Sequence, residues 1–126
     1  MAEIKLVIPG RLPGLNELID AERTHRQKGA KIKRDAESVI RWCIRQQLRK
    51  ARPKTPVTLH YHFIEKDRRR DLDNIFSFAS KVIQDALVKE NILPDDGWKY
   101  VCGFTAEFDV DKGKPRIEVT IEEGMK

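Results

Sequence analysis

Residues 57–108 restrict the possible folds of this 126-residue chain more than any other segment. Between residues 57 and 63, apolar side chains alternate strictly with polar ones, which is typical of a β-strand with one buried face. Residues 75–90 then carry apolar side chains at spacings of three and four, which predicts an amphipathic helix. Alternation returns at residues 100–108. A strand, a helix and a further strand in this order predict a domain that packs helices against a sheet.

The N-terminal part of the chain has a weaker pattern. Residues 4–8 alternate and end at Pro9, which predicts a short strand. Residues 10–29 show no steady period and contain several helix breakers, so we expect a long loop there. This loop is rich in basic side chains and is a candidate arm for the phosphate backbone of a nucleic acid. Its basic side chains are Arg11, Arg23, His25, Arg26 and Lys28.

Two further segments complete the expected fold. A helical stripe covers residues 30–52 and stops at Pro53. Its expected buried members are Ile32, Ala36, Val39, Ile40, Cys43, Gln47 or Leu48, and Ala51. Residues 117–121 alternate, and we expect them to form a hairpin with residues 100–108 around a glycine-containing turn. The order strand, helix, strand, helix, strand, strand predicts one α+β domain over residues 1–126. We expect a mixed β-sheet with two main helices on one face.

Charge is distributed unevenly along the chain. Residues 1–52 hold 13 Lys and Arg against 6 Asp and Glu, and residues 53–126 hold 12 against 14, which gives a net charge of +5. A basic half beside an acidic one suits a polyanionic partner approached through a bound cation, although a basic protein without such a partner stays equally open. One basic ridge repeats every four residues on the first helix, and it is either a solvated surface or one that faces DNA. It consists of Arg41, Arg45 and Arg49.

Cysteine and histidine give little support for a metal site of their own. Cys43 and Cys102 are widely spaced within apolar patterns, and we expect buried, reduced thiols. His60 and His62 share one face of a strand, but two histidines without a third ligand are weak evidence. The chain has no apolar run of the roughly 18–20 residues that span a membrane, and no signal-peptide pattern. We therefore expect a cytoplasmic protein without a membrane segment.

Two aspartates lie between the strand at 57–63 and the helix that follows it. Asp71 and Asp73 come directly after three arginines that are suited to bidentate contacts with phosphate. In an extended chain, side chains two residues apart point the same way, whereas on a helix they diverge by roughly 200°. The aspartates therefore face one way if this stretch is extended. Otherwise Asp73 is a helix cap and Asp71 pairs with an arginine.

A second acidic pair, Asp95 and Asp96, follows the same helix. A helix of this length separates its ends by roughly 25 Å. The pair therefore reaches Asp71 and Asp73 only if the connection folds back or if a second chain supplies it. Clustered carboxylates suit a hard cation such as Mg²⁺, which activates water and stabilises charge on a phosphodiester. A hydrolytic nuclease would use all of these groups at once.

Three stretches carry a resemblance to a known family: DRRRDLDN, a helix with a lysine before DAL, and LPDDGW before the last strands. Together they resemble the RusA family of Holliday junction resolvases. The likeness runs through Ile121, and its specific residues lie between Asp67 and Asp96. The family consists of Mg²⁺-dependent homodimeric endonucleases, often carried by prophages, that cut four-way DNA junctions symmetrically in recombination and repair. The resemblance implies a RusA-like fold, a homodimer, branched DNA as partner, Mg²⁺ or Mn²⁺ as cofactor, and no organic cofactor.

The resemblance also implies roles for individual residues. The implied catalytic residues are Asp71, Asp73, Asp96, Lys81 and Arg70, and the three aspartates are also the implied metal ligands. Asn74 completes the DLDN signature, and Asn16 resembles a proline-and-asparagine segment near the N-terminus of the family. Together with the basic loop, the expected DNA-binding residues are Arg68, Arg69, Arg70, Asn16, Arg26 and Lys28.

Lys81 departs from the family pattern. The family lysine lies four residues after the second aspartate of DLDN, where this chain has Ser77. Lys81 keeps the spacing to DAL instead, so it lies one helical turn, roughly 6 Å, further along. Its long stem compensates for the shift, or one of the preceding arginines takes its part. Two rival functions stay open: a branched-DNA-binding protein without catalysis, and a nuclease for other branches such as flaps.

Overall fold

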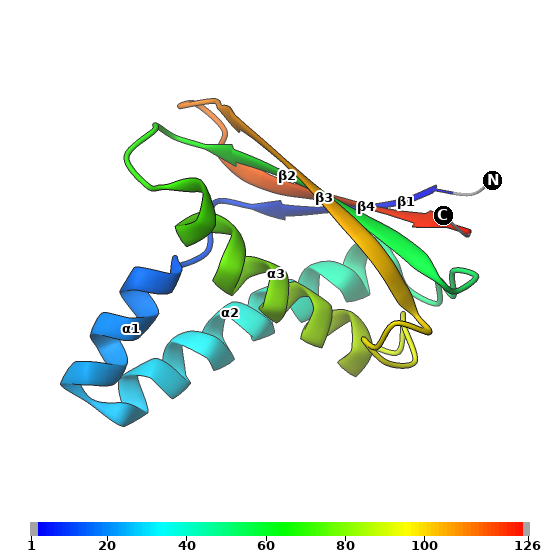
Figure 1. Ribbon diagram of the computed structural model, residues 1–126, viewed down its shortest axis with the longest axis horizontal. Coiled ribbons are helices and arrows are strands. Elements are labelled where there is room, and N and C mark those ends of the chain that lie inside the picture. The colour runs from blue at the N-terminus through cyan, green and yellow to red at the C-terminus, as the bar shows by residue number, and fades with distance from the viewer. Residues whose placement is uncertain (1–2, 125–126) are drawn as a thin grey trace.

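A computed structural model describes residues 3–124 as a four-stranded sheet with three helices packed on one face (Figure 1). The elements are β1 (Glu3–Pro9), α1 (Leu15–Thr24), α2 (Arg26–Gln47), β2 (Val57–Glu65), α3 (Leu72–Lys89), β3 (Val101–Val110) and β4 (Arg116–Glu123). The predicted α+β class, with its mixed sheet and main helices on one face, is confirmed. No helix within residues 3–124 is long and apolar enough to cross a lipid bilayer.

The strands are arranged in the order β1-β4-β2-β3. β2 pairs in parallel with β3, to which α3 connects it, and β4 runs antiparallel between β1 and β2. The predicted hairpin of the last two strands is therefore wrong, because β2 separates them. The connection after β3 passes over the end of β2, where the N–H of Asp111 donates to the carbonyl of Glu65 (2.8 Å). Alternation specifies which face of a strand is buried, but it does not specify the strand's neighbour.

The long loop predicted at residues 10–29 is a second correction, because most of it is helical. Leu15–Thr24 forms α1, and α2 begins at Arg26 after a single extended residue, His25. The carboxylate of Glu17 accepts a hydrogen bond from the N–H of Gly14 (3.2 Å), which caps the start of α1. Arg26 and Lys28 consequently lie on the first turn of α2 and not on an extended arm.

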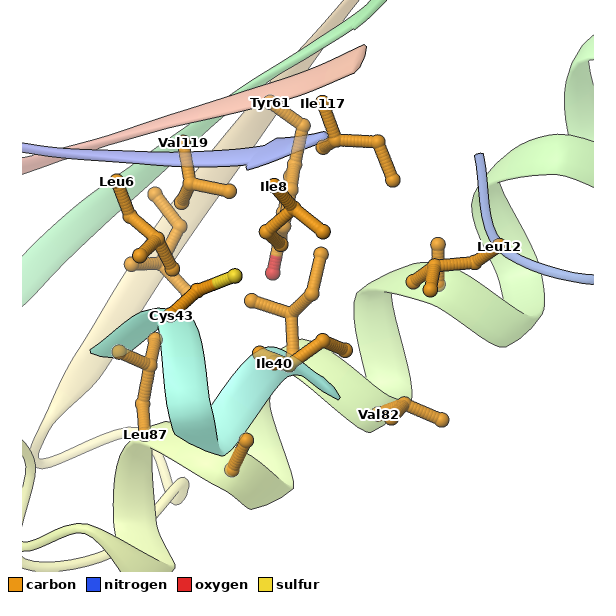
Figure 2. Packing of buried hydrophobic residues seen from close by; sticks show 14 of the residues in the cluster. Leu6, Ile8, Leu12, Ile40, Cys43, Tyr61, Val82, Leu87, Ile117 and Val119 are labelled. Atoms are coloured by element: carbon orange, nitrogen blue, oxygen red, sulfur yellow. The ribbon is translucent and has the colours of Figure 1, made fainter. Parts of the chain in front are cut away.

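The core lies between the sheet and the helices. Figure 2 shows Ile40 and Cys43 of α2 beneath Leu6 and Ile8 of β1. The predicted inner face of α3 is confirmed, since all seven of its apolar residues are buried. They are Ile75, Phe78, Ala79, Val82, Ile83, Ala86 and Leu87. On α2 the predicted stripe is wrong at one position, because Val39 is 48% exposed and Ile44 is buried. Cys43 and Cys102 are both free thiols; Cys43 is buried as predicted, whereas the prediction is wrong for Cys102, which is only partly buried.

Candidate active site

Asp71 and Asp73 lie where β2 has ended and α3 begins. Asp71 is the N-cap residue of α3, with an extended backbone, and Asp73 follows in the first helical turn. Asp73 accepts a hydrogen bond from the N–H of Asn74 (2.9 Å), whereas the side chain of Asp71 makes no capping hydrogen bond. Both side chains are exposed, and within residues 3–124 neither forms an ion pair. The alternative in which Asp73 caps the helix and Asp71 pairs with an arginine is wrong, and both carboxylates are open to a ligand.

Arg70, directly before Asp71, is bound within the protein. Its Nε and Nη2 donate to both carboxylate oxygens of Glu65 at 3.0–3.2 Å, and its Nη1 donates to the carbonyl of Leu12 (2.9 Å) and to Glu17 (3.3 Å). A guanidinium has five N–H donors, so these contacts leave it little capacity for a phosphate. The side chain of Arg70 is only 11% exposed and that of Glu65 only 6%. In this structure Arg70 connects the segment before α1 to the end of β2.

The sequence reasoning missed Glu65. A signal was available, because Glu65 is the acidic residue that ends the clearest strand and lies five residues before an arginine. Arg68 and Arg69 differ from Arg70, since both are exposed. The N–H of Arg69 donates to the carboxylate of Asp67 (3.0 Å), which turns the chain between β2 and α3.

Asn74 of the DLDN signature holds the N-terminal segment. Its Oδ1 accepts a hydrogen bond from the N–H of Asn16 (2.7 Å), in the first turn of α1. The amide of Asn74 also packs against Gly14, where a Cβ atom would lie 2.7–2.9 Å from it. Only glycine fits there without a shift of Asn74. Because Arg70 binds Leu12 as well, the segment before α1 is fixed to the DLDN motif at two points, and Asn16 lies close to the motif.

Lys81, near the middle of α3, lies beside Asp96 of the turn that follows the helix. The Nζ of Lys81 lies 3.1 Å from a carboxylate oxygen of Asp85 and 3.6 Å from one of Asp96. Asp85, and to a smaller extent Asp96, raise the pKa of Lys81. The turn that carries Asp96 follows the C-terminal end of α3, whereas Asp71 begins the helix (Figure 1). The structure therefore brings Lys81 to Asp96 and not to Asp71 and Asp73.

One chain does not assemble the three implied metal ligands. Within residues 3–124, no three His, Cys, Asp or Glu side chains lie close enough together to hold a metal ion. The connection after α3 does not fold back to Asp71 and Asp73, so the first of the two routes considered for Asp96 is wrong. His60 and His62 are held by carboxylates on the open face of the sheet, at 2.9 Å from Glu122 and 2.5 Å from Asp109.

A family model described as endodeoxyribonuclease RusA matches residues 20–122, which is most of the chain. This chain belongs to the RusA family. The resemblance inferred from the motifs is thereby confirmed, and the family is one of endodeoxyribonucleases. The match includes every implied catalytic residue from Arg70 to Asp96, whereas Asn16 lies before its first residue. A search of curated proteins finds no match for the chain.

Hollows line the side of α3 in this RusA-family chain, from the DLDN motif to the Asp96 turn. A cleft of about 610 Å³ borders Asp71 and the end of β3. The next hollow, of about 340 Å³, lies over Phe76 and Phe104, and a third borders Asp96. β3 is the edge strand, and Phe104 is 55% exposed although its ring lies 5.4 Å from that of Phe76 on α3. Leu72 of α3 is 56% exposed. We call this surface the α3/β3 groove. It consists of Leu72, Phe76, Phe104, Ala106 and Phe108, and Asp73 also lines it.

Some basic residues of α2 bind another helix, whereas others are exposed to solvent. Arg41 and Arg45 both bind Glu90, the C-cap residue of α3, with nitrogen–oxygen distances of 2.6–3.0 Å. These two members of the basic ridge therefore join α2 to α3. Arg26 and Lys28 are exposed at the corner between α1 and α2, at the opposite end of α1 from the DLDN motif (Figure 1).

Proposed function

We propose that this chain is a divalent-metal-dependent endodeoxyribonuclease that resolves four-way DNA junctions by paired incisions, and that it acts as a homodimer. One observation carries the proposal. In a RusA-family chain, the two aspartates of DLDN are exposed and without an ion-pair partner in residues 3–124, at the start of a well-packed helix. Carboxylates in that state are suited to a cation that arrives from outside the chain.

The donor set fits Mg²⁺, and Mn²⁺ takes similar oxygen ligands. Asp71 and Asp73 of one copy and Asp96 of a second copy would hold the ion. When bound, the ion lowers the pKa of water and neutralises charge that develops on the phosphate. One chain offers only part of this set at any one place, which is the reason for proposing a second copy.

A two-fold dimer accounts for the separation of the aspartates. If α3 of each copy runs antiparallel to α3 of the other, each Asp96 approaches the Asp71 and Asp73 of its partner. The α3/β3 groove offers an apolar surface along this line of contact, and exposed apolar patches of this kind commonly mark protein interfaces. Such a dimer has two active sites, as paired incisions in a four-way junction require.

The remaining residues then take separate roles. Lys81, held beside Asp96, would enter the site together with Asp96 and stabilise charge on the scissile phosphate. Arg68 and Arg69 are exposed next to Asp71 and would bind phosphates, whereas Arg70 would support the segment that carries Asp71. Asn16, Arg26 and Lys28 would extend the DNA-binding surface along α1.

A mixing experiment tests both the catalysis and the shared site. Asp71→Asn and Asp96→Asn should each abolish Mg²⁺-dependent cleavage of a synthetic four-way junction. When the two variants are unfolded together and refolded as a mixture, mixed dimers contain one intact shared site, so nicking should return. A site built from a single chain would carry one substitution in every copy, and the mixture would stay inactive. Cleavage of flaps in preference to four-way junctions would contradict the substrate assignment.

A further inference from the structure

Trp98 is the most exposed large apolar side chain among residues 3–124, at 95% of its full surface. Its turn is fixed at the base. The carbonyl of Gly97 accepts hydrogen bonds from the N–H groups of Tyr100 and Val101 (both 2.9 Å), and the carbonyl of Tyr100 accepts one from Val57 (2.9 Å). The indole therefore projects from an ordered turn that is attached to the start of β2. Because the backbone of the turn is already ordered and a tryptophan side chain has only two χ angles, the indole loses little conformational freedom when it binds a flat ligand.

The surroundings of Trp98 are charged. Asp96 lies two residues before it, and Lys99 follows it. Lys81 approaches Asp96 to 3.6 Å, so a second lysine lies near this turn. A hollow of about 310 Å³ borders both Asp96 and Trp98. The indole thus lies in the same turn as a proposed metal ligand and borders the same hollow, and a lysine follows it in the sequence.

These observations favour a nucleobase over a protein surface as the occupant. The centre of a protein interface is depleted in lysine and aspartate, and both residue types flank Trp98 here. An exposed aromatic ring beside lysines is the arrangement on which proteins stack unpaired bases while they bind the adjacent phosphates. Bases next to the branch point of an open junction cost less to unstack than bases inside a duplex, because each has already lost one stacking neighbour.

Building on the proposed function, we propose that Trp98 stacks on a base of the branched DNA next to the scissile phosphate. The ring would hold the strand in register with Asp96, in the same turn. Trp98 would then determine both the affinity for branched DNA and the position of the cut.

Trp42 provides a matched control, because it is also exposed but lies on a different element, α2. In a Trp42→Phe background, the fluorescence of Trp98 should be quenched when a four-way junction is added in EDTA. Trp98→Ala should weaken junction binding at least about fivefold, the lower end for loss of one stacked base. Trp98→Phe should recover most of this loss, and Trp42→Ala should bind as the wild type does.

Two results would overturn the proposal. Unchanged junction affinity in Trp98→Ala would show that Trp98 makes no contact with a base. A monomeric Trp98→Ala in analytical ultracentrifugation would assign the ring to the interface between copies. Both measurements are made without cleavage, so their results do not depend on whether the chain has the proposed nuclease activity. That function would fail instead if the wild type cut no branched DNA in Mg²⁺.

Discussion

Replacement of Arg70 by methionine tests whether this residue supports the structure or binds phosphate. Methionine keeps most of the stem but removes every N–H donor, so it leaves the carboxylate of Glu65, which is 6% exposed, without its main partner. Removal of one partner from a buried ion pair costs about 3–5 kcal/mol. Arg11 remains 3.8 Å from Glu65 and offsets part of that cost, so we expect about 3 kcal/mol. In a domain of this size that loss lowers Tm by roughly 10 °C.

Arg69→Met is the matched control, because the side chain of Arg69 is 88% exposed and has only a 3.7 Å contact with Asp67. It should change the free energy of unfolding by no more than about 0.5 kcal/mol. Urea unfolding followed by circular dichroism measures both variants, and Glu65→Gln in the Arg70→Met background should restore part of the lost stability. The reasoning is refuted if Arg70→Met is as stable as Arg69→Met. Loss of cleavage with full stability would mean that Arg70 acts on the phosphate.

Three further predictions concern other contacts. Arg45 and Arg41 lower the pKa of Glu90. The resulting stability is fully present above the ordinary glutamate pKa, so the Tm difference between wild type and Glu90→Gln should be largest at neutral pH, begin to shrink below about pH 4 and vanish only once the pH is below the lowered pKa. Gly14→Ala should cost about 1–3 kcal/mol in urea unfolding, because its Cβ meets the Asn74 amide, and Asn74→Ala in the same chain should relieve the clash. Lys81→Ala should lower kcat about 10²-fold, and adding Ser77→Lys should not restore it if the lysine acts beside Asp96.

The sequence predicted best where a pattern repeats over many residues. The stripe of α3, from Ile75 to Leu87, extends over about three and a half turns, and each residue that it predicts to be buried is buried. The position of Asp71 and Asp73 between a strand and a helix could be predicted equally well, because the patterns of both flanking elements are strong. The prediction that Val39 is buried was wrong because the apolar residues of α2 fit either of two neighbouring helix faces. Only contacts with the sheet determine that the face with Ile44 is the buried one.

The parts that could not be predicted depend on partners far apart in the sequence. α1 has an apolar stripe, but it is only ten residues long and follows Pro13 and Gly14, so the stripe is too short to stand out; its N-terminus is held by Asn74, 58 residues away from Asn16. The pairing of β4 with β1 and β2 is a similar case, because alternation gives a strand its faces but not its neighbours. The role of Arg70 could not be derived either, since its partners Glu65 and Leu12 lie in different elements and the arginine run alone favours phosphate binding.

The proposed shared site also gives a reason for the displaced lysine. Relative to the family pattern, one additional turn between DLDN and Lys81 moves both Lys81 and the Asp96 turn about 6 Å further from Asp71 of the same chain. The relation of Lys81 to Asp96 is kept, and Lys81 reaches Asp96 at 3.6 Å. A lysine that acted on its own chain's Asp71 and Asp73 would be misplaced by this turn. A lysine that enters the partner's site together with Asp96 would not be misplaced, because the additional turn displaces Lys81 and Asp96 by the same amount. The spacing to DAL, and not the spacing to DLDN, is then the one that the chemistry requires.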